Sequence, residues 1–393
     1  MLTVMEMLAH PTFKNFRLIS DRSGLNNPIR NAAILDWETG KAVDDSFFPG
    51  DFVVTSLAAF KDDPELANST LASLIKKNIT GLAINDICFS DVSDNILALA
   101  NACHIPVFMF SGTNMTEIIY ALKNEMTFTE INKNAMKTMR KIIYQTNKRE
   151  EIDNLAREIN PFFSNNIICA FAMPVDFDNK ETILNKLASG YRDYLNTIKI
   201  DPEVSYSFLF LLIGVCIIYT DQRPGRELKN DLYDLIGQFP ISTEDFAVGF
   251  SDQMNMLADT DMAAKQAIYA ATDAKINHES FKDYRDIGFT RVLCPLRSDY
   301  WMKNYYENLL NTINSYDEKH DSHLFDTIKD YIHCNGDINA AAEASFQHPN
   351  TIRYRIKKAQ ELLQPESIMD FRLQMYTIVR LHEINYLLTD WRL

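Results

Sequence analysis

The chain has 393 residues, 46% of them apolar and 23% charged, which are ordinary proportions for a folded globular protein. They exclude a disordered or collagen-like chain, and the length is sufficient for two or three domains. The longest apolar run, 208–219, is shorter than the roughly 20 residues that span a bilayer, so we expect no membrane segment. The net charge of -14 means that the surface as a whole repels nucleic acid, so any DNA contact requires a locally basic segment.

The first residues and the cysteines predict a cytoplasmic location. The N-terminal segment lacks a basic stretch that leads into an apolar run, so we expect no secretory signal. The six cysteines stand singly without a C-x-x-C pair, a pattern that favours reduced thiols over disulfides or a zinc site.

Residues 1–125 alternate short apolar runs with amphipathic stretches. Runs rich in β-branched and aromatic residues predict strands at 32–35, 52–57, 79–84 and 107–110. Between them, apolar residues in helical spacing predict helices at 64–77 and 94–103. Because strand and helix alternate at the spacing of βαβ units, we predict an α/β domain with a largely parallel sheet.

Residues 126–164 are predicted to form a helical connector. Apolar stripes separated by charges indicate helices through 116–159. These are either a pair of packing helices or a connector that pairs with its copy in a dimer, because the apolar residues recur at near-heptad intervals. Pro161 and the pair Asn165-Asn166 mark the end of the connector.

Residues 165–300 are predicted to form a second α/β domain. Strands are expected at 167–173 and 246–250, and helices at 180–198, 231–238 and 259–277. The apolar segment 208–219 is either one long buried strand or a tight pair broken at Gly214.

From residue 301 onward strand patterns are absent, and 301–393 is predicted to be an all-α domain. A first helix contains Leu324, Ile328 and Ile332 and ends near the turn pair Asn335-Gly336. Asp337 is placed to cap an alanine-rich helix over 338–344, and after a turn at 345–347 a third helix begins near Pro349. Helix, tight turn and basic helix form the plan of a helix-turn-helix DNA-binding unit.

The third helix is the local basic segment that the net charge requires. Between residues 346 and 363 four residues are basic and one is acidic. Its first turns are expected to meet base edges through His348, Asn350, Thr351 and Arg353. Further along, Arg355, Lys357 and Lys358 are expected to hold phosphates, whereas Tyr354 either stacks on the backbone or packs inside. The alternative is a solvated basic helix on an ordinary helical subdomain.

A family resemblance supports the DNA-binding interpretation. The Asn335-Gly-Asp turn, the alanine-rich helix and His348-Pro-Asn-Thr-Ile-Arg-Tyr-Arg-Ile-Lys-Lys resemble the C-terminal helix-turn-helix of PucR-type (purine catabolism regulator) transcription factors. Pro49-Gly-Asp-Phe-Val-Val-Thr and Ile79-Thr-Gly-Leu-Ala-Ile are similar to that family's N-terminal domain. The middle segment, ending in Tyr284-Arg-Asp-Ile-Gly-Phe-Thr-Arg-Val-Leu, resembles its degenerate diguanylate-cyclase-like (GGDEF-like) domain. Phe346 and Pro349 depart from the family's helix-turn-helix pattern.

No enzyme, cofactor or metal is expected. The middle segment has no Gly-Gly-Asp/Glu-Glu-Phe stretch to hold metal ions and phosphates, so a catalytically inactive domain is predicted. Phosphate-binding, metalloprotease, nucleophile-elbow and dinucleotide motifs are also missing. His320 and His323 are close in sequence, but the acidic residues around them suit a solvated turn.

The N-terminal domain is the candidate sensor. In parallel sheets, ligands bind beyond the carboxyl ends of the strands. Polar residues follow the four predicted strands there and form the candidate ligand site: Asp36, Thr55, Ser56, Asn85, Asp86, Ser111 and Thr113.

These observations predict a cytoplasmic transcriptional regulator that binds double-stranded DNA and a small-molecule effector, without a membrane partner. The resemblance implies a purine or nitrogen-related effector. The final helix, 370–388, packs against the DNA-binding unit or supports a homodimer or higher oligomer. The alternative is a metabolite-binding signalling enzyme or adaptor whose C-terminal helices contact proteins.

Overall fold

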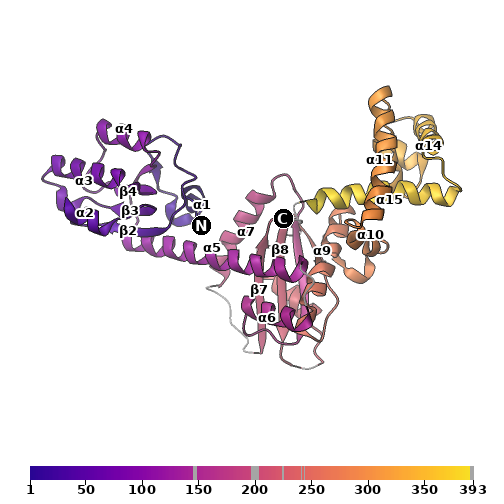
Figure 1. Cartoon of the computed structure of the whole chain (residues 1–393), viewed down its shortest axis with the longest axis horizontal. Coiled ribbons are helices and arrows are strands. Elements are labelled where there is room, and N and C mark those ends of the chain that lie inside the picture. Colours follow the sequence, from indigo (N-terminus) through magenta and orange to yellow (C-terminus); the bar gives the residue numbers. More distant parts are fainter. Residues whose placement is uncertain (145–147, 196–202, 224, 240, 243, 390–393) are drawn as a thin grey trace. The chain divides into compact units, whose positions relative to one another are not determined.

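The computed structural model describes residues 1–144, 148–195, 203–223, 225–239, 241–242 and 244–389. The chain divides into two compact units, Met1–Ala135 and Met136–Leu393, whose elements are labelled in Figure 1. Within the described residues, none of the helices combines the length and the apolar character needed to cross a membrane.

The first unit contains a five-stranded sheet with the strand order β1-β5-β4-β3-β2. Its strands are β1 (Arg17–Leu18), β2 (Asn31–Leu35), β3 (Asp51–Thr55), β4 (Gly81–Asn85) and β5 (Val107–Phe110). Strands β2 to β5 pair in parallel, as the alternating pattern predicts. The short strand β1 pairs antiparallel with β5. It was not predicted, because a strand of two residues is too short to show a hydrophobic periodicity.

Helices cover both faces of this sheet. Val53 and Leu82 face α3 (Pro64–Lys76) and α4 (Asp94–Ala102), with α2 (Lys41–Ser46) beside them. Phe52 and Ala83, one residue away along each strand, face α1 (Val4–Leu8) and the first turns of α5 (Met115–Tyr144). Burial on both faces explains why these strands are almost continuously apolar in sequence.

The second unit begins within α5, which runs without a break through the predicted boundary at residue 125. Helix α6 (Arg149–Ile159) follows, so the segment 116–159 forms two helices. The remaining helices of the middle region are α7 (Lys180–Leu195), α8 (Lys229–Gly237), α9 (Thr260–Ile276) and α10 (Thr290–Leu296).

The sheet of the second unit has the order β10-β9-β6-β8-β7. Its strands are β6 (Asn166–Pro174), β7 (Val204–Leu211), β8 (Gly214–Asp221), β9 (Phe246–Phe250) and β10 (Phe281–Asp283). The apolar segment 208–219 is therefore the second half of β7, a tight turn and most of β8, which is the second of the two predicted alternatives. Gly214 begins β8 where a Cβ atom would lie 2.3 Å from the carbonyl oxygen of Ala172, so only glycine fits there.

Helix α9 crosses this sheet at very short range. A Cβ atom on Gly249 of β9 would lie 2.0 Å from the backbone nitrogen of Ala271. The alanines that face the sheet, such as Ala267 and Ala271, are fully buried. Small residues on both elements therefore permit a helix-to-strand approach that any larger side chain would prevent.

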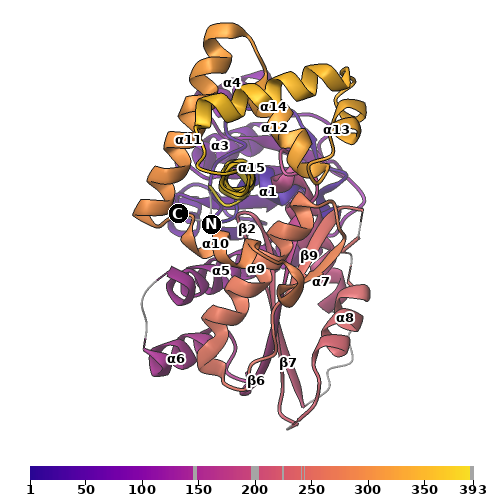
Figure 2. The same ribbon diagram turned by 90° about the vertical axis from the view of Figure 1, so that its right-hand side faces the viewer.

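The C-terminal region is helical, as predicted. It contains α11 (Tyr300–His320), α12 (Leu324–His333), α13 (Ile338–Ala344), α14 (Pro349–Leu363) and α15 (Ile368–Leu387). Figure 2 shows α12, α13 and α14 grouped beside α15. Phe371, Met375 and Ile378 of α15 share a core with Leu324, Ile328 and Ala359. The final helix thus packs against the helix-turn-helix unit, and its predicted role in a dimer stays a prediction.

Candidate DNA-binding site

The turn before α12 is held by one carboxylate. Asp317 of α11 accepts hydrogen bonds from the backbone nitrogens of Leu324 (2.7 Å) and Phe325 (2.9 Å) and from the hydroxyl of Ser322. These bonds satisfy backbone donors that the first turn of a helix leaves without partners. The sequence gives no indication of this cap, because Asp317 reaches α12 across the α11–α12 turn.

The corner between α12 and α13 follows the prediction. Asn335 and Gly336 both adopt positive φ values, 53° and 83°, which allow the chain to reverse direction. Asp337 then caps α13, since its carboxylate accepts from the backbone nitrogens of Asn339 (2.7 Å) and Ala340 (3.1 Å).

Helix α14 crosses α13 over small side chains. Ala341 and Ala342 are buried and share a small core with Ile352 of α14. In the turn between these helices, Phe346 has a φ of 55° and is 94% exposed. His348 caps α14 by accepting a 3.1 Å hydrogen bond from the backbone nitrogen of Asn350 to its Nδ1 atom.

The outer face of α14 carries the predicted base-contacting residues. Asn350 and Arg353 are exposed, and Arg353 Nη1 donates a 2.7 Å hydrogen bond to Asn350 Oδ1. Tyr354 is 66% exposed, so of its two predicted positions the structure excludes packing inside. Lys357 is exposed, while Thr351 is half-buried.

Beyond the Arg353–Asn350 pair, three more of the predicted DNA-contacting side chains have intramolecular partners. Arg355 is half-buried, and its Nη1 donates a 3.2 Å hydrogen bond to Thr327 Oγ1 of α12. Lys358 forms a 3.2 Å ion pair with Glu361, whose hydrogen bond raises the pKa of the lysine. The Lys358 ammonium also lies 5.3 Å from the ring centre of Tyr316. The His348 ring is already used as the helix cap.

The candidate ligand residues of the first unit lie at the carboxyl edge of its parallel strands. Thr55 and Asn85 are buried, and their side-chain oxygens accept hydrogen bonds from the backbone nitrogens of Leu57 and Ile87. Ser56 accepts similarly from Ala58. Asp36, Asp86 and Ser111 are exposed and Thr113 is half-buried. The parallel strands follow one another in sequence order, so this edge lacks the strand-order reversal that opens a ligand crevice in doubly wound sheets.

The arrangement of α12, α13 and α14 is that of a helix-turn-helix unit. Residues 324–376 match the PucR C-terminal helix-turn-helix domain, and residues 6–136 match the purine catabolism regulatory protein-like family. The two matched segments lie toward the two ends of the chain. The resemblance of the middle region to nucleotide cyclases stays a prediction.

Two named proteins are similar to the chain. The DNA-binding transcriptional activator AdeR from Bacillus subtilis (strain 168) is 21% identical over 155 residues, which are 36% of this chain and 35% of that protein. The chain thus spans about a third of the length of this curated relative. A crystal structure of a regulator of polyketide synthase expression from Bifidobacterium adolescentis is 14% identical and covers 65% of this chain and 98% of its own, with a TM-score of 0.31. That score is too low to carry a structural argument.

Proposed function

We propose that the protein is a transcriptional regulator, not an enzyme, and that it binds promoter DNA through α14. The observation that carries this proposal is the exposed Asn350 and Arg353 pair on the first turns of α14, the last of the three helices of the helix-turn-helix unit. In this position side chains reach base edges in the major groove, where amide and guanidinium groups pair with adenine and guanine. Lys357, one turn further along and exposed, is suited to a phosphate.

The remaining domains are proposed to regulate DNA binding. In this scheme the first unit senses a small metabolite. The family resemblance suggests a compound of purine or nitrogen metabolism. The middle domain is proposed to be catalytically inactive and to couple protomers in a homodimer or higher oligomer. Its β7–β8 turn at Leu212 and Ile213 is apolar, whereas a nucleotide cyclase needs carboxylates for metal ions at that type of hairpin.

The test is fluorescence anisotropy of the full-length protein on DNA from upstream of its own gene, with shuffled DNA as control, across a salt series. Specific binding that weakens steeply with salt is expected, because bound lysine and arginine release counterions from the phosphates. Equal affinity for both DNAs at every salt concentration, or the absence of binding, would contradict the proposal and favour an adaptor role for the C-terminal helices.

A further inference from the structure

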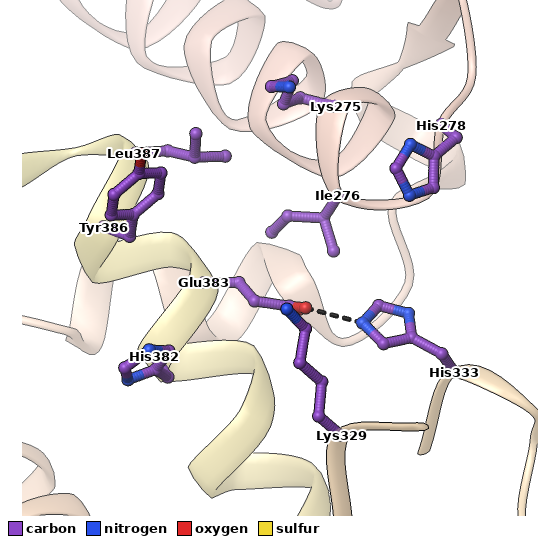
Figure 3. A pocket seen from close by; sticks show the side chains of 9 residues that line it. All are labelled: Lys275, Ile276, His278, Lys329, His333, His382, Glu383, Tyr386 and Leu387. Atoms are coloured by element: carbon purple, nitrogen blue, oxygen red, sulfur yellow. Dashed lines mark hydrogen bonds and ion pairs between the residues drawn. The ribbon is translucent and has the colours of Figure 1, made fainter. Parts of the chain in front are cut away.

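A cavity of about 360 Å³ lies in the second unit, between the end of α9 and helices α12 and α15. Its volume falls within the range of small-molecule sites, roughly 300 to 1,000 Å³. Figure 3 shows the side chains of Lys329 and His333 entering it from α12, Glu383 from α15 and Ile276 from α9. Neither the sequence patterns nor the proposed function accounts for this cavity.

Five of the nine residues that line the cavity carry a basic or imidazole side chain, although most of the lining surface is apolar. Lys275 and Lys329 contribute two positive charges and Glu383 one negative charge, in a chain whose net charge is -14. The rings of His278, His333 and His382 complete the polar lining. Loss of solvation around the ring, followed by the charge of Lys329, lowers the pKa of His382. Asp176 and Asp178 offset the charge of Lys275, so Lys329 is the lining cation whose positive charge favours an anionic occupant.

The simplest role of basic residues here is to offset helix dipoles. Lys275 lies in the last turn of α9 and His333 in the last turn of α12, where cations are stabilising. Lys329 is different, because it lies one turn before the end of α12. Its side chain makes no hydrogen bond or ion pair with the described residues. Its ammonium therefore remains available to a ligand.

Apolar side chains form the other part of the cavity. Ile276 and Leu387 are buried residues that contribute to its lining. Tyr386 closes one side, held in place by a 2.9 Å hydrogen bond to Asp178, and Lys275 is held by the carbonyl oxygen of Val175. The lining thus suits an anion that carries a short hydrocarbon body.

The cavity wall is connected to the core of the middle domain. His333 Nε2 and Glu383 Oε1 are 2.6 Å apart, and Glu383 also pairs with Arg380 at 3.5 Å. Arg380 Nη2 donates a 2.6 Å hydrogen bond to Asn277, which in turn donates to Asp273 at 2.9 Å. Burial raises the pKa of Asp273, which also accepts from Thr290 at 2.6 Å. A continuous chain of polar contacts therefore joins α10 and α9 to α15 and α12.

We propose that this cavity binds a small carboxylate- or phosphate-bearing anion, with the Lys329 ammonium as the principal donor. The anion competes with Glu383 for His333. Occupancy therefore changes the contact between α15 and α12, the first helix of the helix-turn-helix unit. This last step rests on the proposed DNA-binding function, whereas the binding site itself does not.

The binding test is calorimetric titration of the full-length protein with two probes, inorganic phosphate and succinate, which distinguish phosphate from carboxylate recognition. Saturable binding of at least one probe is expected. Lys329→Gln should weaken it roughly tenfold or more, because a charge-assisted hydrogen bond is lost. Glu383→Gln should strengthen it, because the competing negative charge is removed. Lys186→Gln is the control for Lys329→Gln, because it removes one positive charge at an exposed site on α7. It should leave anion binding unchanged.

Lys329→Gln and Glu383→Gln are therefore expected to change the affinity for the anion in opposite directions. A general loss of folding would lower the affinity in both variants. Absence of saturable binding by both probes, or equal affinities in wild type and Lys329→Gln, would overturn the proposal. The coupling to DNA is tested separately, by anisotropy with and without the bound probe. Anion binding without an effect on DNA affinity would retain the site and reject the coupling. If the protein does not bind DNA but still binds a probe saturably, the proposed function fails and the anion site stands.

Discussion

Arg355 Nη1 of α14 donates a 3.2 Å hydrogen bond to Thr327 Oγ1 of α12. The same hydroxyl donates to the backbone carbonyl of His323 at 2.8 Å. The arginine therefore fixes α14 to α12, the first helix of the unit. The contact gives Arg355 a structural role, while its predicted role at phosphates stays a prediction.

Arg355→Ala should lower the stability of the helix-turn-helix unit by about 1 kcal/mol, the typical contribution of one hydrogen bond. Thermal unfolding followed by circular dichroism measures the change. Since its guanidinium faces α12, the salt dependence of DNA binding should remain close to that of wild type. A salt slope reduced by about one, with unchanged stability, would instead place Arg355 at a phosphate.

Arg353→Ala and Lys357→Ala should affect DNA binding differently. Loss of Arg353 should reduce affinity for the specific site by about 1 to 3 kcal/mol and leave affinity for shuffled DNA nearly unchanged. Loss of Lys357 should weaken both DNAs similarly and reduce the salt slope by about one. Anisotropy on the two DNAs separates these outcomes, and an equal, salt-insensitive loss from both variants would contradict the assigned roles.

Phe346→Gly should stabilise the protein by about 1 kcal/mol. Phe346 has a φ of 55°, which glycine adopts without the steric cost that a Cβ atom brings. Its ring is 94% exposed, so little packing is lost. Chemical denaturation measures the gain, with Phe346→Ala as control because alanine keeps the backbone strain. A lower midpoint for the glycine variant would show that the ring makes a stabilising contact.

Asp221→Asn should destabilise the protein by about 2 kcal/mol at neutral pH, the typical contribution of a hydrogen bond to a charged group whose partner, Arg223, is partly exposed. The Asp221 carboxylate is fully buried and accepts a 2.6 Å hydrogen bond from Arg223. This bond lowers its pKa below the ordinary value of 3.8.

The pH dependence of this variant follows from the direction of the shift. A lowered folded pKa gives stability that is fully present above 3.8 and is lost as the pH falls through the folded value. The difference between wild type and Asp221→Asn should therefore shrink in acid. Calorimetric unfolding across pH measures it, with the exposed Asp245→Asn as control. A difference that stays constant down to pH 2 would contradict this account.

Much of the fold could be predicted because its determinants are local. Strand and helix periodicity located β2 to β5, and the Asn335-Gly336 pair located the corner before α13. Periodicity could not choose between one strand and two at 208–219, because both alternatives are apolar throughout. The close approach of Gly214 to the backbone of Ala172 exists only once β6 lies alongside, so no local pattern shows it.

The site was harder to predict than the fold, since the roles of its residues depend on partners distant in sequence. The basic character of α14 was visible, but the Thr327 hydroxyl beside Arg355 and the Tyr316 ring beside Lys358 come from other helices. The cavity beside Lys329 is built from three elements, and no pattern within any one of them indicates it.

Helix α15 contacts both the helix-turn-helix unit and the middle domain. Its first half shares the core of the helix-turn-helix unit through Phe371 and Met375, and its second half carries the Arg380 and Tyr386 contacts to the middle domain. A helix of 20 residues is about 30 Å long. If the helix tilts as a rigid body, about ten degrees at α9 displaces its far end by roughly 5 Å. Such a displacement exceeds the spacing between successive base pairs, about 3.4 Å, so a small tilt would change which bases the recognition helix meets.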